Sequence, residues 1–428
     1  MTQLEIARAG ELSPEMVAVA ESEQVEPEVV RQGLAAGTIV LPANVNRTRS
    51  RPAAIGADMR IKVNANIGTS AEDPGPDGAG DRLRAALAAG ADTVMDLSTA
   101  GDLDALRRIV IAGSPVPVGT VPIYQAAVQA AEGGNGIIAM SDDDLFAVID
   151  KQAADGVDFI TVHCGVTRDT SRLALETGRL TGVVSRGGAF TICWMQARDR
   201  ENPLYERFDD LLDICRKHDV ALSLGDGLRP GCLADGSDHA QIAETALLGD
   251  LVLRARNAGV QAMVEGPGHL PLDQVLPNVV LQKRLCHRAP FYVLGPIVTD
   301  VAPGYDHISG AIGGALAGMA GADFLCYLTP AEHLGLPSAD EVREGVLATR
   351  VAAHAADIVR LGRRARLWDD DMARARGRLD WDEQFRLSLD PERARSRHRP
   401  AGEDKAACSM CGPYCVFSLL SKSVAARK

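Results

Sequence analysis

Short runs of β-branched and other apolar residues recur along the chain, separated by longer stretches rich in Ala, Leu and Arg. Stretches such as DRLRAALAAGA and RFDDLLDICRKH show the spacing of amphipathic helices. The apolar runs predict nine strands, at residues 60–66, 92–98, 115–121, 158–163, 183–187, 220–227, 261–268, 291–296 and 323–330. Repeated strand–helix alternation indicates an α/β protein with a parallel sheet, and this many units favour a (β/α)8 barrel of the TIM type. One predicted strand is in excess of the eight, and the pattern does not say which.

The segments outside this repeat predict three further parts of the chain. A small helical and strand element occupies residues 1–55, the barrel 56–335, Ala/Arg-rich helices 336–400 and a tail 401–428. The polar stretch SRHRPAGEDKAA, with its Pro and Gly, is typical of a linker into this tail. Within the barrel, IGGALAG at 312–318 indicates a helix that packs closely through small residues.

The composition of the chain argues against several kinds of partner and cellular location. The formal charge is −12, and no basic stretch interleaves with aromatic residues, which argues against nucleic acid. The first 25 residues carry acids throughout and no signal-peptide core, and no window reaches the roughly 18 apolar residues that span a membrane. The cysteine count is nine, odd and scattered except near the end, which favours a reduced cytoplasm over a disulfide framework.

Nearly every predicted strand ends in side chains that can bind or react. Any one of them could be a cap or turn residue, but barrel enzymes place their sites at the carboxyl ends of strands, so together they predict one site at the barrel mouth. SRGG (185–188) and DGLRP (226–230) pair Gly-rich backbone with arginine, which suits a phosphate monoester. Tyr124 and Tyr292 could stack on a heterocycle or pack in the core. The strand-end residues are Asn64, Asn66, Met95, Asp96, Tyr124, His163, Ser185, Arg186, Asp226, Arg229, Glu265, His269 and Asp300.

Two groups of residues suit metals. His269 and His333 follow separate strands and could hold a divalent metal with open coordination positions, although their spacing alone is a weak signal. The tail reads CSMCGPYC, in which three cysteines are one short of the four that complete a structural zinc site or an iron–sulfur cluster. A [4Fe–4S] cluster on three cysteines leaves one iron open to a substrate or cofactor. The alternative is a non-radical, metal-dependent barrel lyase with a structural zinc tail, for which His398 is the only nearby fourth ligand.

Long motifs spread from about residue 35 to 418 carry a resemblance to a known family. They are KVNANIGTS, MDLST, SPVPVGTVPIYQA, SRGG, ENPLYE, LSLGDGLRPG, VEGPGH, FYVLGP, VTDVAPGYDHI, AIGGALA, TPAEHLGLP, LDPERAR and CSMCG. Together they resemble the phosphomethylpyrimidine synthase family, radical S-adenosylmethionine enzymes that make the pyrimidine half of thiamin. The chain resembles the short members, with three residues between Cys411 and Cys415.

The resemblance implies a reaction and its cofactors. The substrate would be 5-aminoimidazole ribotide and the product 4-amino-5-hydroxymethyl-2-methylpyrimidine phosphate, with release of formate and carbon monoxide by a carbon–carbon lyase. A [4Fe–4S] cluster on Cys408, Cys411 and Cys415 would bind S-adenosylmethionine and start the radical chemistry, and zinc would sit on His269 and His333. The family also implies an electron donor protein and a homodimer in which each cluster arm reaches the partner's barrel.

The resemblance carries thirteen substrate contacts to this chain: Asn66, Met95, Tyr124, His163, Ser185, Arg186, Gly187, Asp226, Gly227, Leu228, Arg229, Glu265 and Tyr292. The chain departs from the family at Ala100, where glycine is usual, and at Ala197, Arg198 and Asp199, where histidines or lysines are common. A paralogue, 5-hydroxybenzimidazole synthase, resembles the chain throughout and uses the same ribotide for a cobamide precursor. The synthesis of 5-hydroxybenzimidazole is therefore an alternative to the synthesis of the thiamin pyrimidine.

Overall fold

The computed structural model describes residues 1–47, 51–132, 134, 136–401 and 404–425. The chain forms two compact units, Met1–Ala356 and Asp357–Lys428. Within the described part of the chain, no helix has the length and apolar character needed to cross a membrane.

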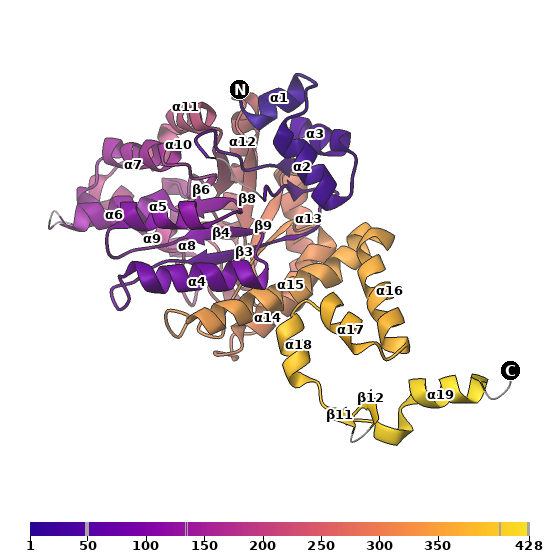
Figure 1. Cartoon of the computed structure of the whole chain (residues 1–428). Coiled ribbons are helices and arrows are strands. Elements are labelled where there is room, and N and C mark those ends of the chain that lie inside the picture. Colours follow the sequence, from indigo (N-terminus) through magenta and orange to yellow (C-terminus); the bar gives the residue numbers. More distant parts are fainter. Residues whose placement is uncertain (48–50, 133, 135, 402–403, 426–428) are drawn as a thin grey trace. The chain divides into compact units, whose positions relative to one another are not determined.

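The first unit is built on a closed barrel of eight parallel strands (Figure 1). Neighbouring strands follow one another in chain order, and β10 pairs with β3 to close the circle. The strands are short and almost entirely buried, as expected for a parallel sheet covered on both faces. The predicted (β/α)8 barrel is therefore confirmed. Its strands are β3 (Lys62–Ile67), β4 (Thr93–Asp96), β5 (Val118–Thr120), β6 (Phe159–Val162), β7 (Ala221–Leu224), β8 (Ala262–Gly266), β9 (Phe291–Leu294) and β10 (Phe324–Cys326).

One predicted strand is wrong, and it is the one in excess. Residues 183–187 lead into a helix, α9 (Arg186–Arg198). The Ser185 hydroxyl accepts a hydrogen bond from the Gly188 N–H at 3.2 Å and so caps this helix. Only Val183 and Val184 carry the apolar pattern before the cap. The SRGG motif is therefore a helix N-terminus.

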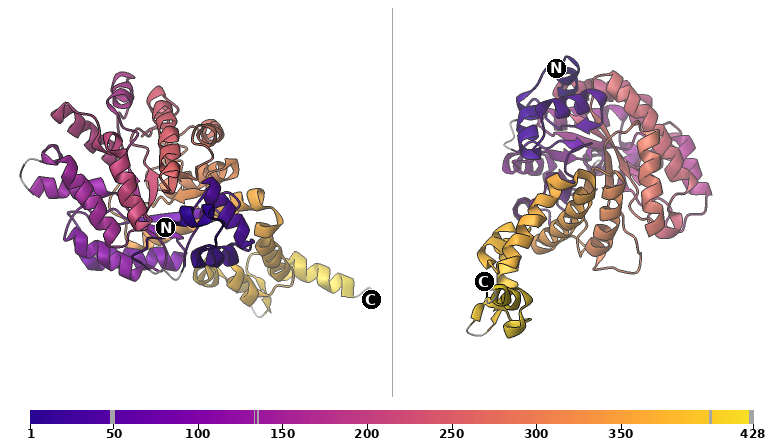
Figure 2. Two further views of the ribbon diagram at one scale, coloured as in Figure 1. Left: turned by 90° about the horizontal axis from the view of Figure 1, so that it is seen from above. Right: turned by 90° about the vertical axis from the view of Figure 1, so that its right-hand side faces the viewer.

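Helices surround the strands, as two further views show (Figure 2). Small residues line α14 where this helix packs against the loop after β9. A side chain larger than glycine does not fit at Gly313, because its Cβ would collide with the Pro296 carbonyl oxygen. This agrees with the close packing expected for IGGALAG. The helical elements are α4 (Pro76–Ala89), α5 (Leu103–Gly113), α6 (Pro122–Glu132), η1 (Ile137–Ala139), α7 (Asp142–Ala154), α8 (Arg168–Glu176), α9, α10 (Pro203–Glu206), α11 (Phe208–His218), η2 (Leu233–Asp235), α12 (His239–Asn257), η3 (Leu272–Gln274), α13 (Val275–Leu285), α14 (Asp306–Ala320) and α15 (Ala339–Leu361), which runs past the end of the first unit.

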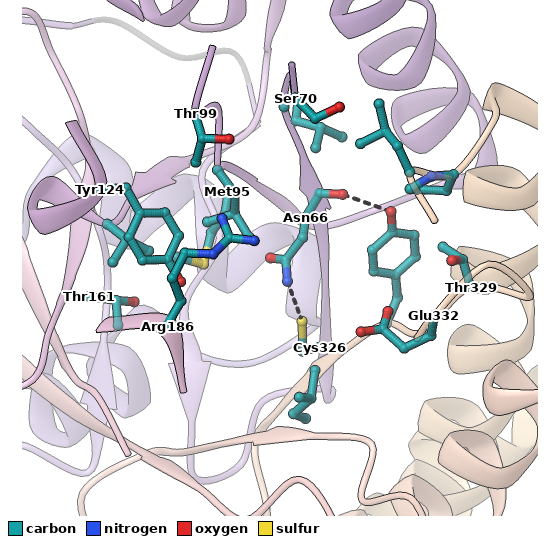
Figure 3. A pocket seen from close by; sticks show the side chains of 18 of the residues that line it. Asn66, Ser70, Met95, Thr99, Tyr124, Thr161, Arg186, Cys326, Thr329 and Glu332 are labelled. Carbon is teal, nitrogen blue, oxygen red and sulfur yellow. Dashed lines mark hydrogen bonds between the residues drawn. The ribbon is translucent and has the colours of Figure 1, made fainter. Parts of the chain in front are cut away.

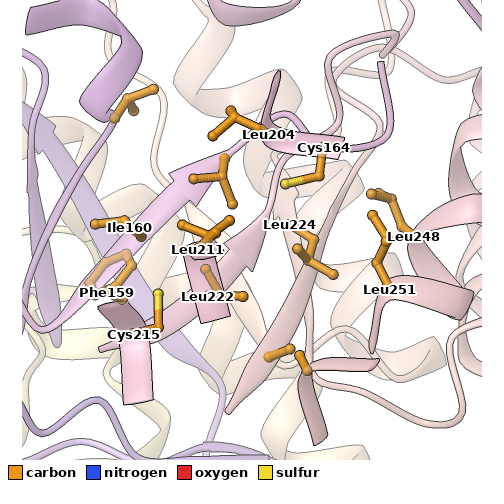
Figure 4. Packing of buried hydrophobic residues seen from close by; sticks show 14 of the residues in the cluster. Phe159, Ile160, Cys164, Leu204, Leu211, Cys215, Leu222, Leu224, Leu248 and Leu251 are labelled. Atoms are coloured by element: carbon orange, nitrogen blue, oxygen red, sulfur yellow. The ribbon is translucent and has the colours of Figure 1, made fainter. Parts of the chain in front are cut away.

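The largest core cluster includes side chains inside the barrel and side chains between the strands and the helices outside them (Figure 4). Leu222 of β7 is fully buried with Leu211 of α11 and Leu251 of α12, whereas Phe159 of β6 lies against Phe324 of β10. Gly119 in β5 leaves room for the Phe159 ring, which a Cβ at that position would strike. Strand and helix positions are therefore fixed by interlocking side chains close to the site described below.

The N-terminal element closes the amino end of the barrel. It comprises α1 (Gln3–Arg8), α2 (Pro14–Glu23), α3 (Pro27–Ala36) and the antiparallel pair β1 (Ile39–Val40) and β2 (Ile55–Gly56), around a core of their own. Buried Glu23 forms an ion pair with Lys62 at the start of β3, with 2.9 Å between their charged atoms. The Thr2 hydroxyl donates to the Gly259 carbonyl, just before β8. The opposite end, where the strands finish, is left for a site.

The second unit contains α16 (Arg363–Gly377), α17 (Trp381–Leu387), α18 (Pro391–Arg397), β11 (Pro400–Ala401), β12 (Asp404–Cys408), η4 (Gly412–Tyr414) and α19 (Val416–Ala425). Its helices agree with the Ala/Arg-rich pattern. The stretch expected to be a linker instead includes the end of α18 and the antiparallel pair of β11 with β12. The Trp381 and His398 rings stack, with 4.0 Å between their centroids.

Candidate active site

A cavity of about 740 Å³ opens at the carboxyl ends of the barrel strands (Figure 3). Nine of the thirteen expected substrate contacts line it, although they come from widely separated parts of the chain. Their roles in binding remain predictions, but their convergence gives one cavity with polar and aromatic walls. They are Asn66, Met95, Tyr124, His163, Arg186, Asp226, Arg229, Glu265 and Tyr292.

The SRGG and DGLR segments meet backbone to backbone beside this cavity. A Cβ at Gly188 would collide with the Gly227 carbonyl oxygen and lie 2.9 Å from the Gly227 Cα. A Cβ at Gly187 would likewise enter the His163 ring. Gly188 is needed because only a hydrogen there allows the start of α9 to lie this close to the loop after β7, and Gly187 is needed for the same reason beside His163, which follows β6.

The four remaining expected contacts, Ser185, Gly187, Gly227 and Leu228, do not line the cavity. Ser185 caps α9, and its hydroxyl lies 3.3 Å from His163 Nε2. Leu228 is fully buried, and its N–H donates to Glu244 of α12 at 2.9 Å. These residues hold the two loops in shape from behind the cavity wall.

Two arginines give the cavity a positive side. The Arg186 guanidinium lies over the Tyr124 ring, 4.9 Å from its centroid, and Figure 3 shows the two side chains together. Arg229 pairs with Asp226 at 3.1 Å. Arg186 is also the first residue of α9, so the positive end of a helix dipole adds to its charge. An anion such as a phosphate fits this side of the cavity.

Buried carboxyls lie next to the arginines. Burial raises the pKa of Asp226 to about 8, with Glu265 adding to the rise and Arg229 opposing it. Burial also raises the pKa of Glu265, whose Oε1 accepts hydrogen bonds from Thr161 at 2.7 Å and Ser223 at 2.8 Å. Protonated carboxyls can donate hydrogen bonds to ligand oxygens, which ionised ones cannot do.

His163 is neutral in this environment. Burial, together with the charge of Arg229, lowers its pKa to about 3. Its Nδ1 is buried and has no hydrogen-bond partner among the described residues. A neutral imidazole with a free ring nitrogen can accept or donate one further hydrogen bond, depending on its tautomer.

The opposite wall of the cavity is a network of amides, hydroxyls and sulfur. Asn64 donates to the Tyr292 hydroxyl at 2.7 Å, and Asn66 donates to Cys326 Sγ at 3.1 Å, as Figure 3 shows for the latter pair. The Tyr292 hydroxyl lies 3.6 Å from Met95 Sδ. This network fixes the orientation of Asn66 and Tyr292 before any ligand enters.

Sequence reasoning missed further cavity residues, among them Arg82, Thr161, Cys326 and Glu332. Cys326 is buried and forms part of the cavity wall. Glu332 directly precedes His333, and burial raises its pKa. Its position as the last residue of β10 was the signal that could have found Cys326.

The two expected metal ligands come together near this end of the barrel. The His269 and His333 rings lie 5.4 Å apart between centroids. His269 Nδ1 lies 2.8 Å from Asp300, and His333 Nδ1 lies 3.4 Å from Asp306. Carboxylates on Nδ1 leave Nε2 as the metal-binding atom, a common arrangement around protein-bound metals. Within the described residues no three His, Cys, Asp or Glu side chains form a metal site, and a metal on this pair would need its other ligands from water or substrate.

The three tail cysteines belong to one turn of the second unit. Cys408 ends β12, Cys411 precedes the one-turn helix η4, and Cys415 follows it. Three thiols in a single turn suit a cluster that needs three protein ligands. A structural zinc site in the tail would need His398 as its fourth ligand. In the structure the His398 ring lies against the Trp381 ring instead.

Comparison with known proteins places the whole chain in context. A family model described as the Radical SAM ThiC family matches residues 2–422. A phosphomethylpyrimidine synthase of Desulforudis audaxviator is 58% identical over 423 residues, covering 99% of this chain and 98% of that protein. Proteins of the same name from Moorella thermoacetica and Dehalococcoides mccartyi are 57% and 56% identical, with the same coverage.

Proposed function

Because the chain belongs to the Radical SAM ThiC family, we propose that it converts 5-aminoimidazole ribotide into 4-amino-5-hydroxymethyl-2-methylpyrimidine phosphate. Formate and carbon monoxide would be released, and the product would supply the pyrimidine half of thiamin. The observation that carries this proposal is the identity of 55–58% with phosphomethylpyrimidine synthases over almost the whole of both chains. The structure supports it with a cavity large enough for a phosphorylated nucleotide.

The phosphate of the ribotide fits the positive side of the cavity. Arg186 and Arg229 supply two guanidinium groups, and Arg186 is the first residue of α9, so the positive end of the helix dipole lies at the same side of the cavity. The glycines of SRGG and DGLR keep these two sources of positive charge together. Binding energy from this non-reacting end would hold the imidazole and ribose in a fixed position.

The remaining walls suit the imidazole and the ribose. Tyr124 and Tyr292 offer ring faces and hydroxyls to the heterocycle, and Asn66 offers an amide. Asp226, whose pKa burial raises to about 8, would donate a hydrogen bond to a ribose hydroxyl without placing a negative charge near the phosphate. His163 can exchange one further hydrogen bond while remaining uncharged.

The proposal includes the family's cofactors. A [4Fe–4S] cluster on Cys408, Cys411 and Cys415, with S-adenosylmethionine on its open iron, would supply the one-electron chemistry. His269 and His333 would hold zinc or another divalent metal. The barrel residues would then bind the ribotide, fix its orientation and keep water away from the reacting centre. We also propose a cytoplasmic homodimer that receives its electron from a separate donor protein.

Anaerobic reconstitution with iron and sulfide tests the proposal. The wild type should gain a cluster spectrum and cleave S-adenosylmethionine only when ribotide is added, whereas Cys408→Ala should lose both. Cys193→Ala is the matched control, because Cys193 is an exposed thiol on α9, in the other unit. Tight zinc in the tail and no cluster would refute the radical mechanism. The product mass would separate the pyrimidine phosphate from hydroxybenzimidazole.

A further inference from the structure

The second unit differs in charge from the chain as a whole. The full chain carries a formal charge of −12, whereas residues 357–428 contain 16 Lys and Arg against 11 Asp and Glu. Part of this excess is concentrated in PERARSRHR, residues 391–399, which has four arginines and one glutamate. A positive region on an otherwise acidic protein indicates a partner of negative charge.

All four of these arginines are exposed, and we call three of them, Arg393, Arg397 and Arg399, the basic segment. Arg393 and Arg397 are four residues apart in α18 and so lie on the same face of that helix. Arg395 differs, because its guanidinium lies over the Phe385 ring, 5.2 Å from the centroid. Neither Arg397 nor Arg399 has a carboxylate partner within the part of the chain that is described.

The basic segment continues directly into the cysteine turn. Pro400 pairs with Cys408 across β11 and β12, and the Ser409 N–H donates to the Arg399 carbonyl at 2.8 Å. The stacked His398 and Trp381 rings hold the chain just before this pairing. Exposed Met410 and Tyr414 add apolar surface on the same turn. A protein bound at the basic segment would therefore sit next to the thiols that the proposed function assigns to the cluster.

From this arrangement we propose that the basic segment is the docking surface for an acidic one-electron carrier protein. The inference rests on the proposed function, because a cluster on this turn needs an electron from outside the chain. In the transfer the reduced carrier loses one electron and the oxidised cluster gains it, and no proton or covalent bond is exchanged. Such contacts are small and transient, and charge steers them more than buried area does.

The test compares two triple charge reversals. R393E/R397E/R399E alters the basic segment, and R363E/R376E/R378E makes the same change in net charge at exposed positions in or next to α16. The carrier used as a probe is a recombinant flavodoxin, an acidic one-electron flavoprotein. Its oxidised form is tested for binding to the protein with and without a cluster. Its reduced form is then mixed with the cluster-loaded protein, and the cluster's visible absorbance gives the rate of reduction.

We expect R393E/R397E/R399E to weaken flavodoxin binding and slow cluster reduction about tenfold at low ionic strength, a difference that salt removes. The R363E/R376E/R378E protein should stay within about twofold of wild type by the same reasoning. Reduced methyl viologen, a small cation, should reduce all three proteins without loss of rate. Iron content shows whether each variant carries its cluster.

Three results would overturn the inference. The first is unchanged flavodoxin binding in R393E/R397E/R399E, and the second is an equal loss of binding in both triple variants. The third is a loss of viologen-driven cleavage of S-adenosylmethionine in R393E/R397E/R399E alone, which would mean that these arginines are needed to bring the cysteine turn to the barrel. Failure of the proposed function would be seen separately, as a wild-type protein that takes up no cluster. Flavodoxin binding could still be measured on that protein, so the docking surface would still be tested.

Discussion

Replacing Gly188 with alanine tests whether the close approach of the two loops shapes the cavity. The new Cβ would collide with the Gly227 carbonyl oxygen and lie 2.8 Å from its carbon, whereas ordinary contacts begin at 3.4 Å. Both partners are backbone, so no side chain can move aside. The loops must separate by roughly 1 Å, a displacement that costs on the order of a hundredfold in rate when it reaches reacting groups.

The expected loss of stability follows from the same contact. Overpacking costs about 1–3 kcal/mol, and a backbone collision belongs near the upper value. Alanine is preferred over glycine in a helix by about 1 kcal/mol, which leaves a net destabilisation of about 2 kcal/mol. Urea unfolding followed by circular dichroism measures this change. Calorimetric titration with ribotide should show at least about tenfold weaker binding, or about 1.4 kcal/mol.

Gly80→Ala is the matched control for Gly188→Ala. Gly80 also lies in a helix, α4, where the added Cβ would meet only the flexible end of Arg84 at 3.3 Å. This variant should keep wild-type ribotide affinity and gain up to about 1 kcal/mol of stability. If Gly188→Ala also bound ribotide and unfolded as the wild type does, the contact between SRGG and DGLR could not be what positions the arginines.

Three further predictions concern the metal, the buried carboxyl and the core. His269→Ala should lose the barrel metal, measured by elemental analysis, and keep the cluster, while the exposed His239→Ala control keeps both; unchanged metal would refute the ligand assignment. The neutral form of Asp226 stabilises the fold. This contribution to the free energy of unfolding is lost as pH rises from the unfolded pKa of about 3.9 towards the folded pKa of about 8. The loss is at most about 1.4 kcal/mol per pH unit. Melting temperatures of Asp226→Asn should therefore fall less steeply with pH than those of the wild type, and parallel curves would contradict the raised pKa. Phe159→Ala should cost about 3–5 kcal/mol in urea unfolding, because the ring is fully buried against Phe324 and Gly119.

The barrel could be predicted because its strands are buried on both faces and separated by amphipathic helices. The run at 183–187 misled because two valines before a serine resemble a strand, whereas the serine oxygen caps a helix. The β11–β12 pair was hidden for a different reason: one strand has two residues and begins with proline, which is uncommon inside sheets. The pairing of β11 with β12 therefore has no hydrophobic pattern from which it could be predicted.

Strand ends and family motifs identified most of the cavity but not its full wall. Thr161 lies within β6, where only the register of the closed barrel decides which residues face the cavity. The raised pKa of Asp226 depends on burial and on Glu265, which lies 39 positions away in the sequence. Such properties arise only after folding, because they depend on distances between distant segments. Sequence reasoning could name these carboxyls without saying that burial would raise their pKa values.

Barrel closure has a consequence for the synthesis of the chain. Cys326 of β10 pairs with Asn64 of β3, and the two residues are 262 positions apart. At roughly 5–20 residues per second, a ribosome needs roughly 13–52 s to make the intervening segment. During that interval β3 has an open edge and β10 does not yet exist, so the growing chain exposes a hydrogen-bonding strand edge that the finished protein lacks. A nascent chain stalled before residue 324 should therefore depend on chaperones, and release from them should follow the emergence of β10.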